Sequence, residues 1–174
     1  MNSQVNILVV EDSPTQATQL QQTLQRHGFH ATCVGNGQAA LTVLRQQRPT
    51  LVLSDIVMPE MDGYQLCHHI KSDRELQTLP VILMTTLTDS REVIRALESK
   101  ADGFITKPCE DSFLCSRIEA ALANPALRAQ PHADGTVQVL FENQRYALTS
   151  QPAQMADLLL STFANAIQKN RELE

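Results

Sequence analysis

Five short apolar runs, separated by segments with helical spacing, constrain the fold of this chain more than any other feature. The runs are Val5 to Val10, Phe29 to Val34, Leu51 to Leu53, Val81 to Met84 and Gly103 to Ile105. Those of the runs that are continuous, without polar alternation, are typical of strands covered on both faces. Between them, aliphatic residues recur at steps of three and four, as in amphipathic helices. The pattern predicts an α/β fold, a doubly wound parallel sheet with helices on both faces.

Local signals agree with this alternation of strands and helices. Ser13-Pro14 has the form of an N-cap followed by proline at the first helical position, and Gly28 is a typical helix stop. Asn36-Gly37 predicts a turn into the second helix. Five strand–helix units then fill residues 5 to about 124.

Composition limits the function classes. The chain has 174 residues, 14 basic against 19 acidic, for a formal charge of −5. This balance gives no global attraction to nucleic acid or to an anionic membrane. No basic segment with a long apolar run opens the chain, and no window approaches ~18 consecutive apolar residues, so we expect a soluble cytoplasmic protein without a membrane span.

The four cysteines show no C-x-x-C spacing and stand in apolar or helical surroundings. We therefore expect small buried hydrophobic side chains in a reducing compartment, and not a disulfide or metal set.

Polar residues follow four of the predicted strands at the point where each ends. They are Glu11-Asp12, Asp55, Thr85-Thr86 and Lys107-Pro108. In an open parallel sheet the carboxyl ends of the strands meet at one edge, where a crevice forms as the winding direction reverses. Three carboxylates crowded there repel one another unless a cation neutralises them, and an all-oxygen set suits Mg²⁺.

This set fits phosphoryl chemistry. The carboxylate of Asp55 is a candidate nucleophile, with the ammonium of Lys107 and a hydroxyl to neutralise phosphoryl oxygens. Each residue alone has an ordinary structural explanation, such as a helix cap or a solvated lysine. Their joint occurrence at the ends of the correct strands favours the chemical interpretation.

The same residues resemble the receiver domain of two-component response regulators, over roughly residues 4 to 124. The resemblance rests on Glu11-Asp12, Asp55 with Met58-Pro59 and Asp62-Gly63, Thr85, and Lys107-Pro108. It implies a flavodoxin-like topology with strand order 2-1-3-4-5. It also implies that a histidine kinase or phosphotransfer protein supplies the phosphoryl group, and that the chain is a signalling receiver which catalyses only its own phosphorylation and dephosphorylation.

The resemblance assigns roles to the acidic residues. Asp55 is expected to accept the phosphoryl group and to contribute to the magnesium site. Asp12 is expected to bind the ion directly, together with the backbone carbonyl of Val57, and Glu11 to act through water.

The remaining roles concern the response. Lys107 would pair with phosphoryl oxygens, Thr85 would move to bond one of them, and Phe104 would follow as the aromatic switch residue. The resemblance also predicts a cis peptide bond before Pro108.

Two positions depart from the family pattern. Val57 and Leu87, two residues beyond Asp55 and Thr85, cannot orient a water by hydrogen bonding, so we expect slow self-dephosphorylation. Thr86 is slightly bulkier than the small residue usual at its position, which predicts slower entry of small phosphodonors.

The C-terminal part changes character. Residues 125–135 contain two prolines and a glycine and predict a linker, residues 136–149 predict a β-hairpin, and residues 150–174 a long helix. That helix has an a/d seam with Asn170 at an a position, which predicts a homodimer, with packing on its own receiver or on the hairpin as the alternative. No helix stop precedes residue 174, so we expect a signalling helix cut before an output module such as a histidine kinase or nucleotide cyclase. No DNA-binding module is encoded within these residues.

Two other function classes compete with the receiver. A magnesium-dependent phosphohydrolase also forms an aspartyl phosphate, but the haloacid dehalogenase type places a D-x-D pattern after the first strand, where this chain has Glu11-Asp12-Ser13. A flavodoxin-like cofactor binder needs a phosphate-cradling loop at that point, and the acidic neighbours disfavour one.

Overall fold

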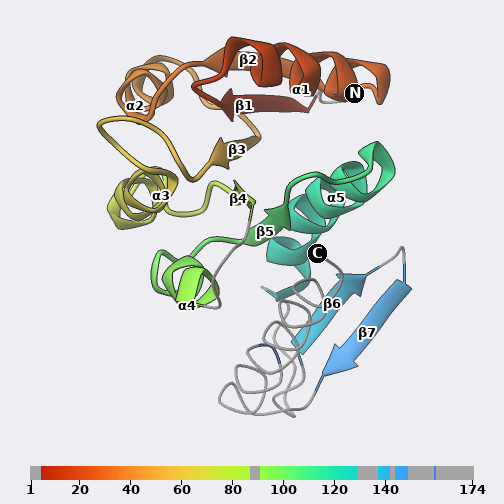
Figure 1. Cartoon of the computed structure of the whole chain (residues 1–174). Helices are drawn as coiled ribbons and strands as arrows, with labels where there is room; N and C mark the ends of the chain where they lie inside the picture. Colours follow the sequence, from red (N-terminus) through yellow and green to blue (C-terminus); the bar gives the residue numbers. More distant parts are fainter. Residues whose placement is uncertain (1–4, 87–90, 129–136, 142–143, 149–158, 160–174) are drawn as a thin grey trace.

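The computed structural model describes residues 5–86, 91–128, 137–141, 144–148 and 159. Its first ten elements alternate strand and helix (Figure 1). They are β1 (Asn6–Val10), α1 (Pro14–Arg26), β2 (His30–Val34), α2 (Gly37–Gln46), β3 (Leu51–Asp55), α3 (Gly63–Ser72), β4 (Val81–Thr85), α4 (Arg91–Glu98), β5 (Gly103–Thr106) and α5 (Asp111–Arg128). A final pair of strands, β6 (Val137–Phe141) and β7 (Gln144–Leu148), follows α5.

The first five strands form one parallel sheet in the order β2-β1-β3-β4-β5. Helices α1 and α5 cover one face of this sheet, and α2, α3 and α4 cover the other (Figure 1). The predicted doubly wound fold and its strand order are confirmed. β1 and β3 lie at the centre, so the residues that follow them meet at the middle of the carboxyl edge.

Burial on both faces explains the apolar run of the central strand β1. Within β1, Leu8 and Val10 pack toward α2 and α3, whereas Ile7 and Val9 pack toward α1 and α5. All four are at most 1% exposed. A strand that is covered on both sides has no solvent face, so it shows no polar alternation.

Side-chain caps begin the helices where the sequence predicted them. The Ser13 hydroxyl accepts from the Gln16 N–H at 3.4 Å, and the Asn36 side chain accepts from the Ala39 N–H at 2.7 Å. Gly28 follows α1 with a φ of +84°, a conformation that glycine adopts without strain. These caps confirm the predicted helix starts and the stop.

A partly buried ion pair secures the amino-terminal edge of the sheet near α3. Lys71 Nζ lies 2.6 Å from Asp102 Oδ2, and the two side chains are 9% and 22% exposed. Lys71 also donates to the Leu79 carbonyl at 2.8 Å, and Asp102 accepts from the Val81 N–H at 2.9 Å. The pair therefore joins the end of α3 to the segment that enters β5.

A hydrogen bond also connects α3 to the residue that follows α4. The thiol of Cys67 donates to the Ser99 carbonyl at 3.2 Å, and the Ser99 hydroxyl donates to the Ala96 carbonyl at 2.7 Å. Both Cys67 and Ser99 are buried. Two hydrogen bonds therefore hold Ser99 at the carboxyl end of α4, one from Cys67 in α3 and one to Ala96 within α4.

The four cysteines are free; Cys67 and Cys115 are buried as expected, whereas Cys33 and Cys109 are only half-buried. Burial raises the pKa of the Cys67 thiol to about 11, which makes it a poor nucleophile at neutral pH. Among the described residues, none of the helices combines the length and the apolar character that crossing a bilayer requires.

The C-terminal part differs from the prediction at one boundary. α5 continues to Arg128, through Pro125, where the linker over 125–135 was predicted to begin. One proline removes a single helical hydrogen bond, and the strong helix formers Ala126, Leu127 and Arg128 extend the helix past it.

The predicted hairpin is present as the antiparallel pair β6 and β7, in which Val139 lies opposite Tyr146. β6 contacts α5. Apart from Leu159, which is helical, the predicted helix over residues 150–174 lies outside the described residues, and so does the rest of the predicted linker after Arg128.

Candidate functional site at the carboxyl edge of the sheet

The acidic residues predicted to share one edge do so. Glu11 and Asp12 follow β1, and Asp55 is the last residue of β3. One carboxylate oxygen from each of these three residues lies within 4.8 Å of the others. Asp12 is exposed, Asp55 is half-buried and Glu11 is only 3% exposed. The cluster therefore runs from the interior of the protein to its surface.

Glu11 is the buried anchor of this cluster. Its Oε1 accepts from the Ser13 N–H at 3.1 Å, and its Oε2 accepts from Lys107 Nζ at 2.9 Å. The Glu11 N–H in turn donates to the Val34 carbonyl at 3.0 Å, which extends the β1–β2 pairing by one residue. A buried carboxylate is tolerated when it is paired and hydrogen-bonded in this way.

Lys107, which follows β5, connects the acidic cluster to Gln16 of α1. Its Nζ lies 3.3 Å from Asp55 Oδ1 and 2.9 Å from Glu11 Oε2. It also donates to Gln16 Oε1 at 2.9 Å. The peptide bond between Lys107 and Pro108 is cis, as predicted.

Gln16 was not identified from the sequence. It stands in the first turn of α1, and an exposed glutamine in a helix carries no signal that it reaches a lysine 91 residues away. Only its position three residues after the Ser13 cap places it at the correct edge of the sheet. Gln16, Thr86 and Lys107 also line one cavity, of about 380 Å³, between α1 and the start of α5.

The start of α3 packs on the backbone of Asp55 and Ile56. Asp55 Oδ1 accepts from the Ile56 N–H at 2.9 Å, and the Gly63 N–H donates to the Ile56 carbonyl at 2.9 Å. Gly63 packs directly on the Asp55 backbone: a Cβ at this position would lie 2.4 Å from the Asp55 carbonyl oxygen. The glycine that follows Asp62 is therefore required by close backbone approach.

Val57, two residues after Asp55, is 73% exposed. Its apolar side chain offers no hydrogen bond to a water. Leu87, the other apolar position predicted to affect dephosphorylation, lies outside the described residues.

Thr85, at the end of β4, is 2% exposed. Its hydroxyl donates to Glu92 Oε2 in α4 at 2.9 Å, and its carbonyl accepts from the Lys107 N–H at 2.6 Å. Phe104 in β5 is half-buried and packs against the core on the α3 side of the sheet. Sequence reasoning identified Thr85 and Phe104 but missed Glu92. The spacing between Thr85 and Glu92 in the sequence gives no sign that their side chains bond to each other.

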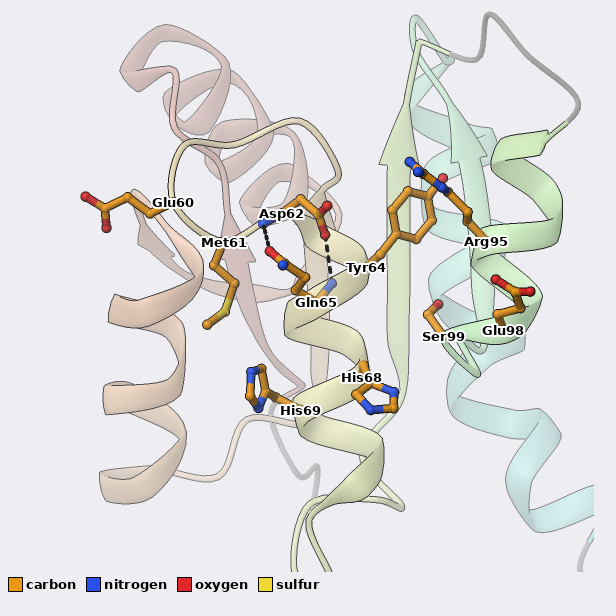
Figure 2. Close-up of a pocket in the computed structure, with 10 residues that line it drawn as sticks. All are labelled: Glu60, Met61, Asp62, Tyr64, Gln65, His68, His69, Arg95, Glu98 and Ser99. Carbon is orange, nitrogen blue, oxygen red and sulfur yellow. Dashed lines mark hydrogen bonds between the residues drawn. The ribbon is translucent and has the colours of Figure 1, made fainter.

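A groove of about 450 Å³ lies between α3 and α4 (Figure 2). Tyr64 extends from the first turn of α3 toward α4, where its hydroxyl donates to the Glu92 carbonyl at 3.0 Å and Arg95 lies 6.0 Å from its ring centroid. Partial burial, followed by the charge of Glu92, raises the pKa of Tyr64 to about 12, although Arg95 opposes the shift.

His68 and His69 also line this groove, and Figure 2 shows their rings pointing in different directions from α3.

The family model of the response regulator receiver domain matches residues 7–119. The chain belongs to the response regulator receiver family. It is a phosphoaccepting domain of two-component signal transduction, so the resemblance stated from the sequence is confirmed. The phosphohydrolase alternative receives no support from the comparisons.

Curated relatives and solved structures agree with this assignment. The DNA-binding response regulator MtrA of Mycolicibacterium smegmatis is 38% identical over 116 residues, 67% of this chain and 50% of that protein. The transcriptional regulatory protein CseB of Streptomyces avermitilis is 37% identical over 137 residues, 78% of this chain and 54% of that protein. The chain thus spans about half the length of these relatives.

Among solved structures, the receiver domain of a signal transduction histidine kinase from Syntrophus aciditrophicus is 47% identical. The match has a TM-score of 0.66 and covers 72% of this chain and 94% of that one.

Proposed function

We propose that Asp55 is the phosphoacceptor of this receiver and that a histidine kinase or phosphotransfer protein supplies the phosphoryl group. An Asp55 carboxylate oxygen attacks phosphorus of the phosphohistidine; a P–O bond forms, the P–N bond breaks, and the leaving imidazole nitrogen takes a proton. The observation that carries the proposal is the position of Asp55, with Lys107 Nζ 3.3 Å away and two further carboxylates beside it.

The acidic cluster fits Mg²⁺. Three carboxylate oxygens within 4.8 Å of one another form a hard-oxygen set, which is the kind of ligand this ion prefers. Asp12, Asp55 and the backbone carbonyl of Val57 would hold the ion directly, with Glu11 acting through water. When bound, Mg²⁺ would neutralise the carboxylates and the phosphoryl oxygens, which lowers the barrier to in-line transfer.

Two side chains of this protein would stabilise the phosphorylated form. Lys107 already lies beside Asp55, so its ammonium can bond a phosphoryl oxygen with a small displacement. Thr85 would donate its hydroxyl to another oxygen, and Phe104 would follow inward as the aromatic switch residue. Exchange of these contacts is a two-state change biased by a local charge, the usual form of a receiver switch.

The phosphorylated state should persist because Val57 gives no hydrogen bond to an attacking water. Its downstream effect would pass through α4, β5 and α5 to the segment after Arg128 and from there to an output module. We retain the helix over residues 150–174 as the candidate relay and self-association element. MtrA is named as a DNA-binding protein, and no output of that kind is proposed for these 174 residues, which we place in the cytoplasm.

The test is intact-mass analysis after incubation with acetyl phosphate and Mg²⁺. Wild type should gain one phosphoryl group, roughly 80 Da, and the gain should disappear in Asp55→Ala and in EDTA. Asp12→Ala should raise the Mg²⁺ concentration needed for half-maximal phosphorylation, whereas Asp73→Ala, an exposed aspartate after α3, should behave as wild type. A gain of equal size in Asp55→Ala would contradict the proposal.

A further inference from the structure

Glu92 occupies an unusual place between the switch threonine and the groove on the α3 side. Its side chain accepts the Thr85 hydroxyl at 2.9 Å, and its backbone carbonyl accepts the Tyr64 hydroxyl at 3.0 Å. Glu92 lies in the first turn of α4, where the positive end of the helix dipole favours a carboxylate. One residue thus connects β4, α3 and α4.

The contact with Thr85 is a strong one for its kind. Thr85 is 2% exposed, and a hydrogen bond to an ionised carboxylate is about twice as strong as one between neutral groups. The Tyr64 contact fixes the backbone of Glu92, so its side chain reaches β4 from a defined position. Tyr64 is itself held, because Arg95 lies over its ring (Figure 2).

A threonine hydroxyl carries a single proton and can donate it to only one acceptor at a time. If that proton goes to Glu92 Oε2, it is not available to a phosphoryl oxygen on Asp55. The two acceptors are both anionic, and they belong to different elements: one to α4, the other to the end of β3.

We propose that Glu92 is a positioning residue that restrains Thr85 in the unphosphorylated protein and competes with the phosphoryl group for the Thr85 hydroxyl. This inference rests on the proposed function, in which Thr85 bonds the phosphoryl group. Phosphorylation of Asp55 withdraws the hydroxyl from Glu92 and releases the first turn of α4 from β4. The two effects are reciprocal. Phosphorylation weakens the Thr85–Glu92 contact by a certain factor, and Glu92 lowers the affinity of the site for a phosphoryl group by the same factor.

The experiment measures binding of beryllofluoride, a phosphoryl stand-in, to the full chain in Mg²⁺ by calorimetry. Glu92→Met removes the acceptor but keeps the side-chain length and the backbone carbonyl that Tyr64 uses. It should tighten beryllofluoride binding by roughly tenfold, the size expected for losing a competing charge-assisted hydrogen bond. Glu98→Met, an exposed glutamate at the far end of α4, is the matched control and should change nothing.

A double-mutant cycle separates competition from a general effect on α4. Thr85→Val keeps the shape of Thr85 but removes the hydroxyl, so Glu92→Met should then change the affinity by less than about twofold. Glu92→Gln, which keeps a neutral acceptor, should give an intermediate effect and serves if Glu92→Met does not fold. Equal effects of the Glu92 substitution with and without the Thr85 hydroxyl would overturn the inference. Binding of beryllofluoride to wild type in the same assay would still support the proposed function. Absence of beryllofluoride binding to folded wild type would overturn both.

Discussion

Substitution of Gly63 by alanine tests how rigidly Asp55 is positioned. The added Cβ would lie 2.4 Å from the Asp55 carbonyl oxygen and 2.9 Å from Ile56 Cα, and real Cβ atoms essentially never approach closer than 3.0 Å. The backbone must therefore shift by at least 0.6 Å (3.0 Å minus 2.4 Å). Neither side moves easily, because β3 is an inner strand and the Asp62–Gln65 capping box fixes the start of α3.

This clash has an expected size in stability and in rate. Overpacking of a well-packed interior costs roughly 1–3 kcal/mol, and a backbone-to-backbone clash belongs at the upper end, about 3 kcal/mol. A 1 Å misplacement of a reacting group can cost about 100-fold in rate, so a shift of 0.6 Å predicts a loss of roughly tenfold in phosphorylation of Asp55.

Urea unfolding measures the first effect, and the initial rate of phosphoryl gain from acetyl phosphate measures the second. Gly35→Ala is the matched control, since a Cβ there meets nothing within 4 Å. It should change stability by less than about 0.5 kcal/mol and leave the rate unchanged. A folded Gly63→Ala protein that phosphorylates at the wild-type rate would refute the argument that the start of α3 positions Asp55.

Three further predictions concern other contacts. Lys71→Met leaves Asp102 with an unpaired, largely buried charge, so the free energy of unfolding in urea should fall by about 2–3 kcal/mol. The control Lys100→Met, at an exposed lysine, should lower it by less than about 0.5 kcal/mol. Similar losses in the two variants would contradict the prediction. The raised pKa of Tyr64, about 12, favours the neutral phenol in the folded protein, so stability should fall as pH rises from about 10 to 12. Tyr64→Phe should remove that part of the loss, and the difference in tyrosinate absorbance between the two proteins should give a midpoint near 12. Val57→Asn should speed self-dephosphorylation by roughly tenfold, measured as decay of the phosphorylated mass, and a wild-type half-life of only seconds would contradict the role given to Val57.

The sequence predicts the sheet and the acidic cluster for a physical reason. Strands covered on both faces must be continuously apolar, and the first polar residue after each one necessarily stands at the carboxyl edge of the sheet. The proximity of Asp12 and Asp55 follows from the neighbouring places of β1 and β3 in the sheet. Lys107 follows β5, two strands away from β3, and reaches Asp55 through its long side chain.

The contacts of Gln16, Glu92 and Tyr64 could not be predicted in this way. They depend on the side-chain reach of residues on different helices, which is set by how each helix lies on the sheet and not by any local pattern. The course of α5 through Pro125 was missed because a proline near a helix end costs one hydrogen bond, a penalty that neighbouring residues can offset.

The fixed carboxyl end of α4 has a mechanical consequence. Cys67 holds Ser99, and the Lys71–Asp102 pair holds the segment that follows, so this end of the helix acts as a pivot. At the other end, Glu92 makes two hydrogen bonds, one of them to the switch threonine. Eight residues of helix form a lever of about 12 Å, so a tilt of about 10° displaces the Glu92 end by about 2 Å and the pivot hardly at all. A partner that senses the state of this receiver through α4 should therefore contact the half nearest Glu92, where Ile94 is 44% exposed.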